Sequence, residues 1–202
     1  MNYNLNEIIT ADDSDISEIT EIILVSNKTT LIAKLGENFV KIFLSLCIKS
    51  QNAKLFTLTS NNTNIAYAIL FKKEKLIVKE LLKLKYNILF TIILRLKFNL
   101  IYTLILIYFN KDLKLISGKK NIDIENSANL TYLAVKQTHR NKGIGRFFIE
   151  NILKKHFKNE FVSVETDNKQ TLNFYTKYLN FEIVGSRKRY KNDLYLLLKK
   201  NK

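Results

Sequence analysis

A glycine-containing loop, His139–Arg146 with the sequence HRNKGIGR, has the residue types best suited to binding chemistry. It follows an apolar run, Leu130–Val135, that is typical of a strand, and it precedes a helical pattern over Phe147–Phe157. Glycines let the backbone approach a ligand closely, and the free N–H groups and positive dipole end of a helix start attract an anion. The order of strand, glycine loop and helix therefore predicts a phosphate site, although an ordinary turn before a helix has the same pattern.

Two polar side chains further along, Asn168 and Tyr175, are the other candidates for chemistry. Asn168 comes after an alternating strand pattern, Phe161–Thr166, and asparagine is a residue type that caps helices. The helix that it begins runs to about Leu179 and carries Tyr175 on the same face as Leu172. A phenol in that position is either a core aromatic or a proton donor.

The composition indicates one domain in a reducing compartment. The chain has 202 residues and is 47% hydrophobic, which is enough for a sizeable core. A single cysteine, Cys47, excludes an intrachain disulfide, and it is expected in the core. With only two histidines, His139 and His156, no metal-ligand cluster of usual spacing can be formed. Met1–Thr10 lacks the features of a signal peptide, so we expect a cytoplasmic protein.

The net charge of +15 points to nucleic acid or an anionic membrane as partners. Solvated lysines in a chain rich in Lys, Asn and Ile explain the same charge without a partner. No RNA-binding motif and no basic–aromatic stacking platform is legible, so we expect no nucleic-acid partner.

The first 71 residues predict a strand, two helices and a hairpin. The expected elements are Tyr3–Thr10, Asp15–Ser26, Thr29–Lys49, Lys54–Thr59 and Ile65–Phe71. Gly36 lies inside the second helix, either as a close-packing residue or as a weak point. The polar run from Ser60 to Asn64 is the expected hairpin turn.

The segment Lys72–Lys120 reads as a helical insertion. Leu76–Leu84 is amphipathic, and Tyr86–Phe109 is almost wholly apolar. The apolar run is long enough to span a membrane, but Arg95 and Lys97 would lie near its middle. Inserting each of these charged residues there would cost about 2.5–3.5 kcal/mol. We therefore expect two helices packed on the domain. The alternatives are an element on an anionic membrane surface or on a partner, since basic residues flank the segment, and a true span.

The last third of the chain predicts strands on either side of the two helices already described. Asn129–Val135 and Phe161–Thr166 precede the helices that begin near Phe147 and at Asn168. A strand pair, Phe181–Arg187 and Leu194–Lys199, ends the chain, and Asn192-Asp193 is the expected turn between them.

Residues 130–200 resemble the GNAT family of N-acetyltransferases. The family signature Arg/Gln-x-x-Gly-x-Gly/Ala is matched by Arg140-Asn141-Lys142-Gly143-Ile144-Gly145. A second signature, an Asn at a strand end followed seven residues later by Tyr, is matched by Asn168 and Tyr175. The resemblance implies an α/β fold over residues 1–202, with a mixed, mostly antiparallel central sheet flanked by helices. The helical insertion at about 72–120 then lies between the third and fourth strands.

The resemblance also implies roles in binding acetyl-CoA. The strand end pairs with the pantetheine arm, the loop N–H groups hold the pyrophosphate, and Lys142 and Arg146 add positive charge. Asn168 and Asn173 hydrogen-bond the arm, and Tyr175 protonates the departing thiolate. The implied coenzyme-binding residues are Leu133, Val135, Arg140, Asn141, Lys142, Gly143, Ile144, Gly145, Arg146, Asn168 and Asn173.

The chain departs from the family pattern at the general base. Some relatives carry a Glu five residues before the Asn, where this chain has Ser163. Glu165 lies two residues on, on the same strand face, and is our candidate base; an ordinary exposed carboxylate is the alternative. Glu125 is a second candidate, and a water chain a third. Asn180 replaces a family glycine after the Tyr helix, and asparagine tolerates the left-handed conformation needed there.

The implied activity is transfer of an acetyl group from acetyl-CoA to a primary amine, by direct attack on the thioester and without a metal. We expect a small-molecule acceptor such as an amino sugar. The alternatives are a protein or peptide amine, an aminoacyl-tRNA, and a non-catalytic acyl-CoA-binding or membrane-surface module. Two further partners are considered: a second copy of the chain, in a homodimer, and an anionic membrane surface that residues 72–120 would contact.

Overall fold

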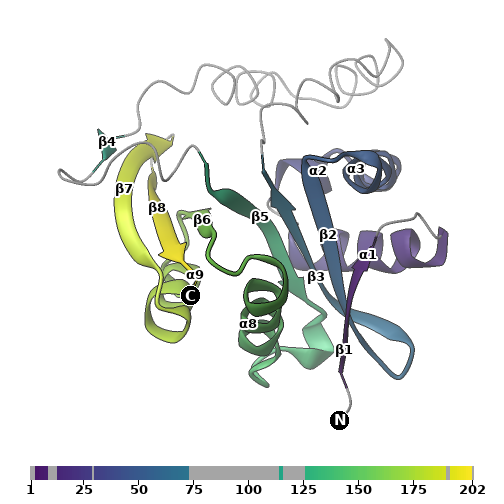
Figure 1. Ribbon diagram of the computed structural model, residues 1–202. Helices are drawn as coiled ribbons and strands as arrows, with labels where there is room; N and C mark the ends of the chain where they lie inside the picture. Colours follow the sequence, from purple (N-terminus) through teal and green to yellow (C-terminus); the bar gives the residue numbers. More distant parts are fainter. Residues whose placement is uncertain are drawn as a thin grey trace.

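One β-sheet runs through the molecule, and the computed structural model describes residues 3–8, 13–28, 30–72, 114–115, 126–189 and 192–201. The strand order is β1-β2-β3-β5-β6-β8-β7-β4 (Figure 1). Among the described strands, β5 with β6 is the parallel pair and the other pairs are antiparallel. The strands are β1 Asn4–Ile8, β2 Ala53–Ser60, β3 Thr63–Phe71, β4 Lys114–Leu115, β5 Ala128–Val135, β6 Phe161–Thr166, β7 Glu182–Arg189 and β8 Asn192–Lys200.

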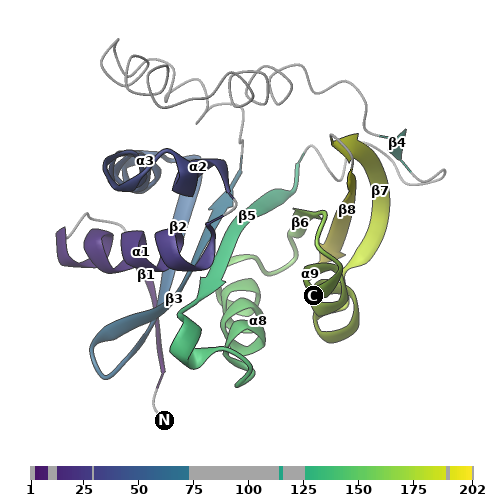
Figure 2. The same cartoon turned by 180° about the vertical axis from the view of Figure 1, so that it is seen from behind.

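Helices cover both faces of this sheet (Figures 1 and 2). On one face α1 (Asp13–Ser26), α2 (Leu31–Lys34) and α3 (Glu37–Lys49) share a hydrophobic core with β2, β3 and β5. On the other face α8 (Ile144–His156) and the π-helical turn η2 (Phe174–Tyr178) pack on β5, β6 and β8. The short helix α9 (Lys169–Asn173) runs directly into η2. The predicted class, a mostly antiparallel α/β sheet flanked by helices, is confirmed.

The predicted hairpin is present as β2 and β3. Its turn places Asn61 at φ 51° and Asn62 at φ 60°. Two consecutive left-handed residues match the right-handed twist of the flanking strands, and asparagine adopts this conformation more readily than most residues. The polar turn sequence therefore specifies both the position and the shape of this hairpin.

The predicted continuous helix Thr29–Lys49 is wrong, because the chain breaks at Gly36. The structure has α2 and α3 on either side of this glycine, whose φ of 91° and ψ of 174° are essentially restricted to glycine. Of the two alternatives for Gly36, the structure supports the weak point in the helix. The break still leaves Cys47 on the core face of α3, as expected, with 1% of its surface exposed.

Two further predictions concern the insertion and the turn between the last two strands. The predicted insertion lies outside the described residues, apart from Lys72 and the two residues of β4. β4 pairs with Gly185 and Ser186 of β7, and a strand this short has no periodicity by which to predict it. The predicted turn at Asn192-Asp193 is wrong, because Asn192 begins β8 opposite Arg189.

Candidate active site

The sheet opens between β5 and β6. The two strands pair only at Ala128 with Val162 and at Asn129 with Ser163, and beyond this point they diverge (Figure 2). An irregularity in the register of β5 against β3 leaves Thr131 as an extra residue, and a bulge of this kind bends the strand that carries it. The divergence leaves the last residues of β5 without a strand on the β6 side.

The backbone of β5 alternates in the direction of its hydrogen bonds. The N–H of Lys136 donates to the Ile65 carbonyl of β3 at 2.7 Å. In an antiparallel ladder, alternate residues bond to the same neighbour, so the backbone groups of Ala134 also point toward β3. The N–H and carbonyl groups of Leu133 and Val135 consequently point toward β6, where the strands diverge. This is the direction that an extended ligand pairing with β5 requires.

The predicted glycine loop follows directly. It contains a short 3-10 turn, η1 (Gln137–His139), and two left-handed residues, Asn141 at φ 59° and Gly143 at φ 74°. The loop is held by side chains, because Arg140 Nε donates to the Val135 carbonyl at 3.0 Å and Lys142 Nζ donates to the Thr138 carbonyl at 3.1 Å. His139 is half-buried, and its Nδ1 lies 2.9 Å from Thr138 Oγ1.

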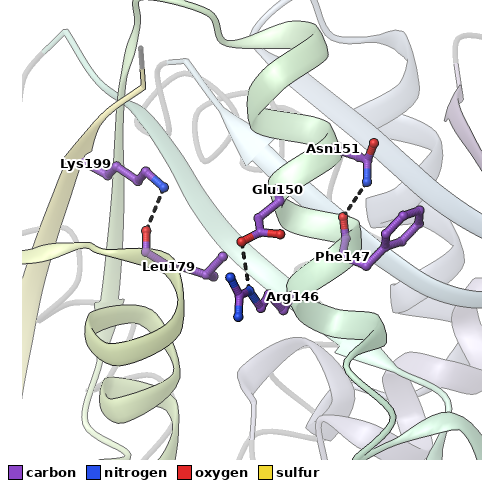
Figure 3. A network of polar contacts seen from close by, with 6 residues as sticks. All are labelled: Arg146, Phe147, Glu150, Asn151, Leu179 and Lys199. Atoms are coloured by element: carbon purple, nitrogen blue, oxygen red, sulfur yellow. Dashed lines mark hydrogen bonds and ion pairs between the residues drawn. The ribbon is translucent and has the colours of Figure 1, made fainter.

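The first turn of α8 offers backbone donors to an anion. Gly143 is the N-cap residue and no side chain caps the helix. The N–H of Phe147 makes the first helical bond, to the Gly143 carbonyl at 3.0 Å, so the N–H groups of Ile144, Gly145 and Arg146 have no acceptor within the helix. Arg146 is exposed beside them, with its Nε 2.9 Å from Glu150 Oε1 (Figure 3). Backbone donors, the helix dipole and this cation together suit a pyrophosphate.

Gly145 lies where three elements meet. A Cβ atom built on Gly145 would be 3.6 Å from Val135 Cγ2 and 3.7 Å from Phe174 Cζ, which is ordinary van der Waals contact. The start of α8 therefore packs between the end of β5 and the start of η2. Phe174 did not stand out in the sequence, and only its place between the two predicted residues Asn173 and Tyr175 pointed to it.

Asn168 is the N-cap that the sequence predicted. Its Oδ1 accepts hydrogen bonds from the backbone N–H groups of Gln170, at 2.8 Å, and Thr171, at 3.1 Å. Its side-chain NH2 group remains as the donor for a ligand. Asn173, at the end of α9, is exposed. Both residues lie on the segment that leads from β6 to Tyr175, and their contacts with a coenzyme remain predictions.

Tyr175 is deeply buried, with 3% of its surface exposed. Its ring packs between the rings of Phe174 and Phe181, with centroids 5.1 Å and 5.3 Å away, and it belongs to the core beneath α8. Burial raises the pKa of the Tyr175 phenol well above its ordinary value, so the hydroxyl stays protonated at neutral pH. The turn after η2 has the expected left-handed asparagine, Asn180 at φ 56°, and the Phe181 N–H closes it onto the Tyr175 carbonyl at 3.0 Å.

Comparisons with known proteins agree with this arrangement. Residues 107–181 match the family model described as acetyltransferase (GNAT) family. Over these residues the chain matches the GNAT acetyltransferase family. It is accordingly an acyltransferase. No curated protein matches the sequence.

Solved structures share the fold at low sequence identity. The GNAT acetyltransferase of Streptococcus agalactiae is 11% identical with a TM-score of 0.61, covering 99% of this chain and 96% of its own. The ribosomal-protein-S18-alanine N-acetyltransferase of Escherichia coli is 14% identical with a TM-score of 0.56, covering 98% and 94%. The NatC complex bound to Gag peptide and CoA is 12% identical with a TM-score of 0.54, covering 100% of both chains.

The GNAT fold places the base candidates on the opposite face of β6 from Tyr175. Val162 and Val164 share the core of Tyr175, so the alternating residues Ser163 and Glu165 face the other way. Ser163 is buried, and the Ser127 hydroxyl donates to its Oγ at 2.8 Å. Glu165 is half-buried at the next position on that face. The structure thus does not bring Glu165 and Tyr175 side by side, and Glu125 lies outside the described residues.

The Ser127–Ser163 hydrogen bond was not predicted, since two serines 36 residues apart have no sequence pattern that joins them.

Within the described ranges, no group of three or more His, Cys, Asp or Glu side chains is arranged to hold a metal. The described helices likewise include none that is long and apolar enough to cross a membrane.

Proposed function

We propose that this GNAT acetyltransferase transfers an acetyl group from acetyl-CoA to a primary amine by direct attack on the thioester. The observation that supports this most is the joint presence of a diverging strand pair and an uncapped helix start at the same end of β5. The first gives an extended arm a backbone edge, and the second gives a pyrophosphate three N–H donors. GNAT enzymes use acetyl-CoA, and the NatC neighbour binds CoA.

The coenzyme would lie along residues from both sides of the divergence. Leu133 and Val135 would pair with the pantetheine arm, while Ile144, Gly145 and Arg146 would donate their backbone N–H groups to the pyrophosphate. Arg140 and Asn141 would shape the loop, and the Lys142 and Arg146 side chains would add positive charge. Asn168 would donate from its side-chain amide to the arm, and Asn173 would contact the arm from the end of α9.

The proposed reaction is a single acetyl transfer with two proton transfers. The amine nitrogen attacks the thioester carbon, the N–C bond forms, and the C–S bond breaks as CoA leaves. The Tyr175 hydroxyl gives its proton to the departing thiolate, and the amine loses a proton to a base. The Tyr175 phenol is protonated at neutral pH, so it is in the form that can donate. The products are an acetamide and free CoA thiol, without a covalent enzyme intermediate.

The amine's proton would leave on the face of β6 opposite Tyr175. Glu165 is the carboxylate on that face, and it would act directly or through water. Ser163, the position at which some relatives carry a glutamate, is neutral and already bonded to Ser127. An acceptor amine with a pKa near neutrality, such as that of an amino sugar, would need little help from such a base, and a small-molecule acceptor of this kind is our proposal. A protein amino terminus is the second candidate, because the Escherichia coli neighbour is named for a protein alanine.

The test is thioester turnover by the full chain with a panel of amines. Free thiol is measured with acetyl-CoA and amino sugars, free amino acids, polyamines or peptides with free amino termini. We expect thiol release that depends on an amine, and a Tyr175→Phe variant with kcat lowered about 100-fold while CoA binding by calorimetry is retained. CoA binding without thiol release from any amine would make the protein a non-catalytic acyl-CoA-binding module. Equal turnover in the Tyr175→Phe variant would remove Tyr175 from its role.

A further inference from the structure

Lys199 makes two contacts at the end of the helical segment that carries Tyr175. It lies on β8, and its Nζ donates to the Leu179 carbonyl at 2.6 Å (Figure 3). The same Nζ is 5.8 Å from the centroid of the Phe181 ring. Leu179 is the C-cap residue of η2, and carbonyl groups at a helix end have no partner within the helix. Lys199 supplies that partner from a strand that is distant in the sequence.

Phe181, one of the two residues that Lys199 contacts, also holds Tyr175 in place. The Phe181 ring packs on the Tyr175 ring, with centroids 5.3 Å apart. The Phe181 backbone N–H also donates to the Tyr175 carbonyl at 3.0 Å. Between Leu179 and Phe181 stands Asn180 in the left-handed conformation, where the chain reverses. Lys199 therefore holds the residues before and after this reversal.

Charge around Lys199 links it to the start of α8. Partial burial lowers the pKa of the Lys199 amine, and the Glu150 carboxylate opposes this effect. Glu150 is also the ion-pair partner of Arg146, at 2.9 Å. Figure 3 shows that Glu150 and Arg146 of α8 face the side on which Leu179 and Lys199 lie. Lys199 thus has a carbonyl, an aromatic ring and a carboxylate nearby, which together compensate the partial burial of its charge.

We propose that Lys199 is a positioning residue for acetyl transfer, fixing the end of the Tyr175 segment through the Leu179 carbonyl and the Phe181 ring. The inference rests on the proposed role of Tyr175 as the proton donor. Lys199 touches neither coenzyme nor acceptor in this scheme. Its loss moves the Tyr175 hydroxyl relative to the thioester sulfur and slows the chemical step, while leaving the phosphate site at α8 in place.

The test compares Lys199→Met, Lys199→Arg and a matched control, Lys200→Met, in the full chain. Lys200 is the next residue of β8, points to the other face, and places its Nζ 5.5 Å from the Phe161 ring. Both methionine variants remove a cation from an aromatic ring, but only one touches the Tyr175 segment. Each variant is measured for kcat, for the KM of acetyl-CoA and for CoA affinity, alone and together with Tyr175→Phe.

A misplaced catalytic group costs about 10-fold to 100-fold in rate. We therefore expect Lys199→Met to lower kcat at least tenfold with CoA affinity within about twofold. Lys199→Arg, which keeps the charge and the donors, should restore much of the loss, and Lys200→Met should match the wild type. In the Tyr175→Phe background, Lys199→Met should have no further effect on kcat.

Two results would overturn the inference: an unchanged kcat in Lys199→Met, or an equal loss with and without Tyr175. If Tyr175→Phe itself is fully active, it is the proposed function of Tyr175 that fails, so the two failures are distinguishable. If Lys199→Met does not fold, native-state hydrogen exchange of the Phe181 amide is measured instead in Lys199→Gln, whose shorter neutral side chain weakens the contact, and in the matched Lys200→Gln. Faster exchange confined to Lys199→Gln supports the positioning role of Lys199, and equal exchange in both variants contradicts it.

Discussion

Arg140 Nε donates to the Val135 carbonyl at 3.0 Å, which ties the glycine loop back to the strand that it leaves. The Ser26 hydroxyl of α1 reaches the same carbonyl at 3.5 Å. Val135 is also the residue whose side chain a Cβ at Gly145 would meet. The last residue of β5 is therefore where the loop, the start of α8 and the end of α1 come together, and its position sets that of the phosphate site.

Arg140 should accept replacement by glutamine but not by alanine. A glutamine amide can donate to the Val135 carbonyl as the guanidinium does, whereas alanine releases the loop. A hydrogen bond from a charged group contributes about 1.5 kcal/mol at its lower end, so Arg140→Ala should weaken CoA binding about tenfold. Calorimetric titration with CoA checks this, with Arg140→Gln expected within about threefold of wild type. Equal affinity of the alanine variant would mean that the loop holds its shape without this bond.

The two glycines of the loop should differ in their tolerance of alanine. Gly143 has a φ of 74°, with no atom within 4 Å of an added Cβ, so Gly143→Ala is opposed by backbone strain alone, about 1–2 kcal/mol. Gly145 lacks a positive φ and has room for a methyl group, so Gly145→Ala should change stability little. Urea unfolding of both variants measures the difference. Gly143→Asn should recover part of the loss, and a larger loss in Gly145→Ala than in Gly143→Ala would contradict the reading.

Much of the local structure around the candidate coenzyme site could be predicted because its signals are local. The strand, the loop and the start of α8 are contiguous, and Asn168 and Tyr175 are seven residues apart on one segment. Helix caps and left-handed turns depend on a few neighbouring residues, so the Asn168 cap and the Asn180 turn were legible in the sequence.

The contacts between distant segments could not be predicted. Lys199 and Leu179 are hydrogen-bonded although they are 20 residues apart in the sequence, and Ser127 and Ser163 although they are 36 apart. No periodicity in the sequence predicts either contact. The prediction of one continuous helix through Gly36 was wrong for a different reason. The apolar spacing on both sides fits a single helix, and only the backbone angles of the glycine separate α2 from α3. A glycine in a helical pattern is ambiguous between packing and termination.

Stability should fall as the pH drops below about 6.5 because of His156. Its ring packs against the Phe56 ring in a tilted arrangement, with centroids 4.7 Å apart, and burial lowers its pKa despite the Glu7 carboxylate at 3.1 Å. Lys54, which pairs with Glu7 at 3.1 Å, and the neighbouring Lys155 act in the same direction as burial. The unfolded chain then binds more protons than the folded chain in this range, so the stabilisation is complete above about pH 6.5 and is lost toward the lower folded pKa.

Urea unfolding at pH 7.5 and pH 5 would measure this dependence. His156→Gln should lose less stability between the two pH values than the wild type does. The other histidine, His139, lies on the glycine loop, and His139→Gln is the control that should leave the His156 contribution intact. The same pH slope in wild type and His156→Gln would show that other groups account for the acid sensitivity.

Glu165→Gln should lower kcat if this carboxylate takes the amine's proton. A positioned general base contributes about 100-fold or more, and the loss should shrink as the pH rises, because the acceptor amine is then already deprotonated. Asp167→Asn is the matched control, since Asp167 is an exposed carboxylate just beyond the end of β6. A loss of kcat confined to Glu165→Gln, largest at low pH, supports the base on the face opposite Tyr175. An equal and pH-independent change in both variants would make Glu165 an ordinary surface carboxylate and leave the proton to water.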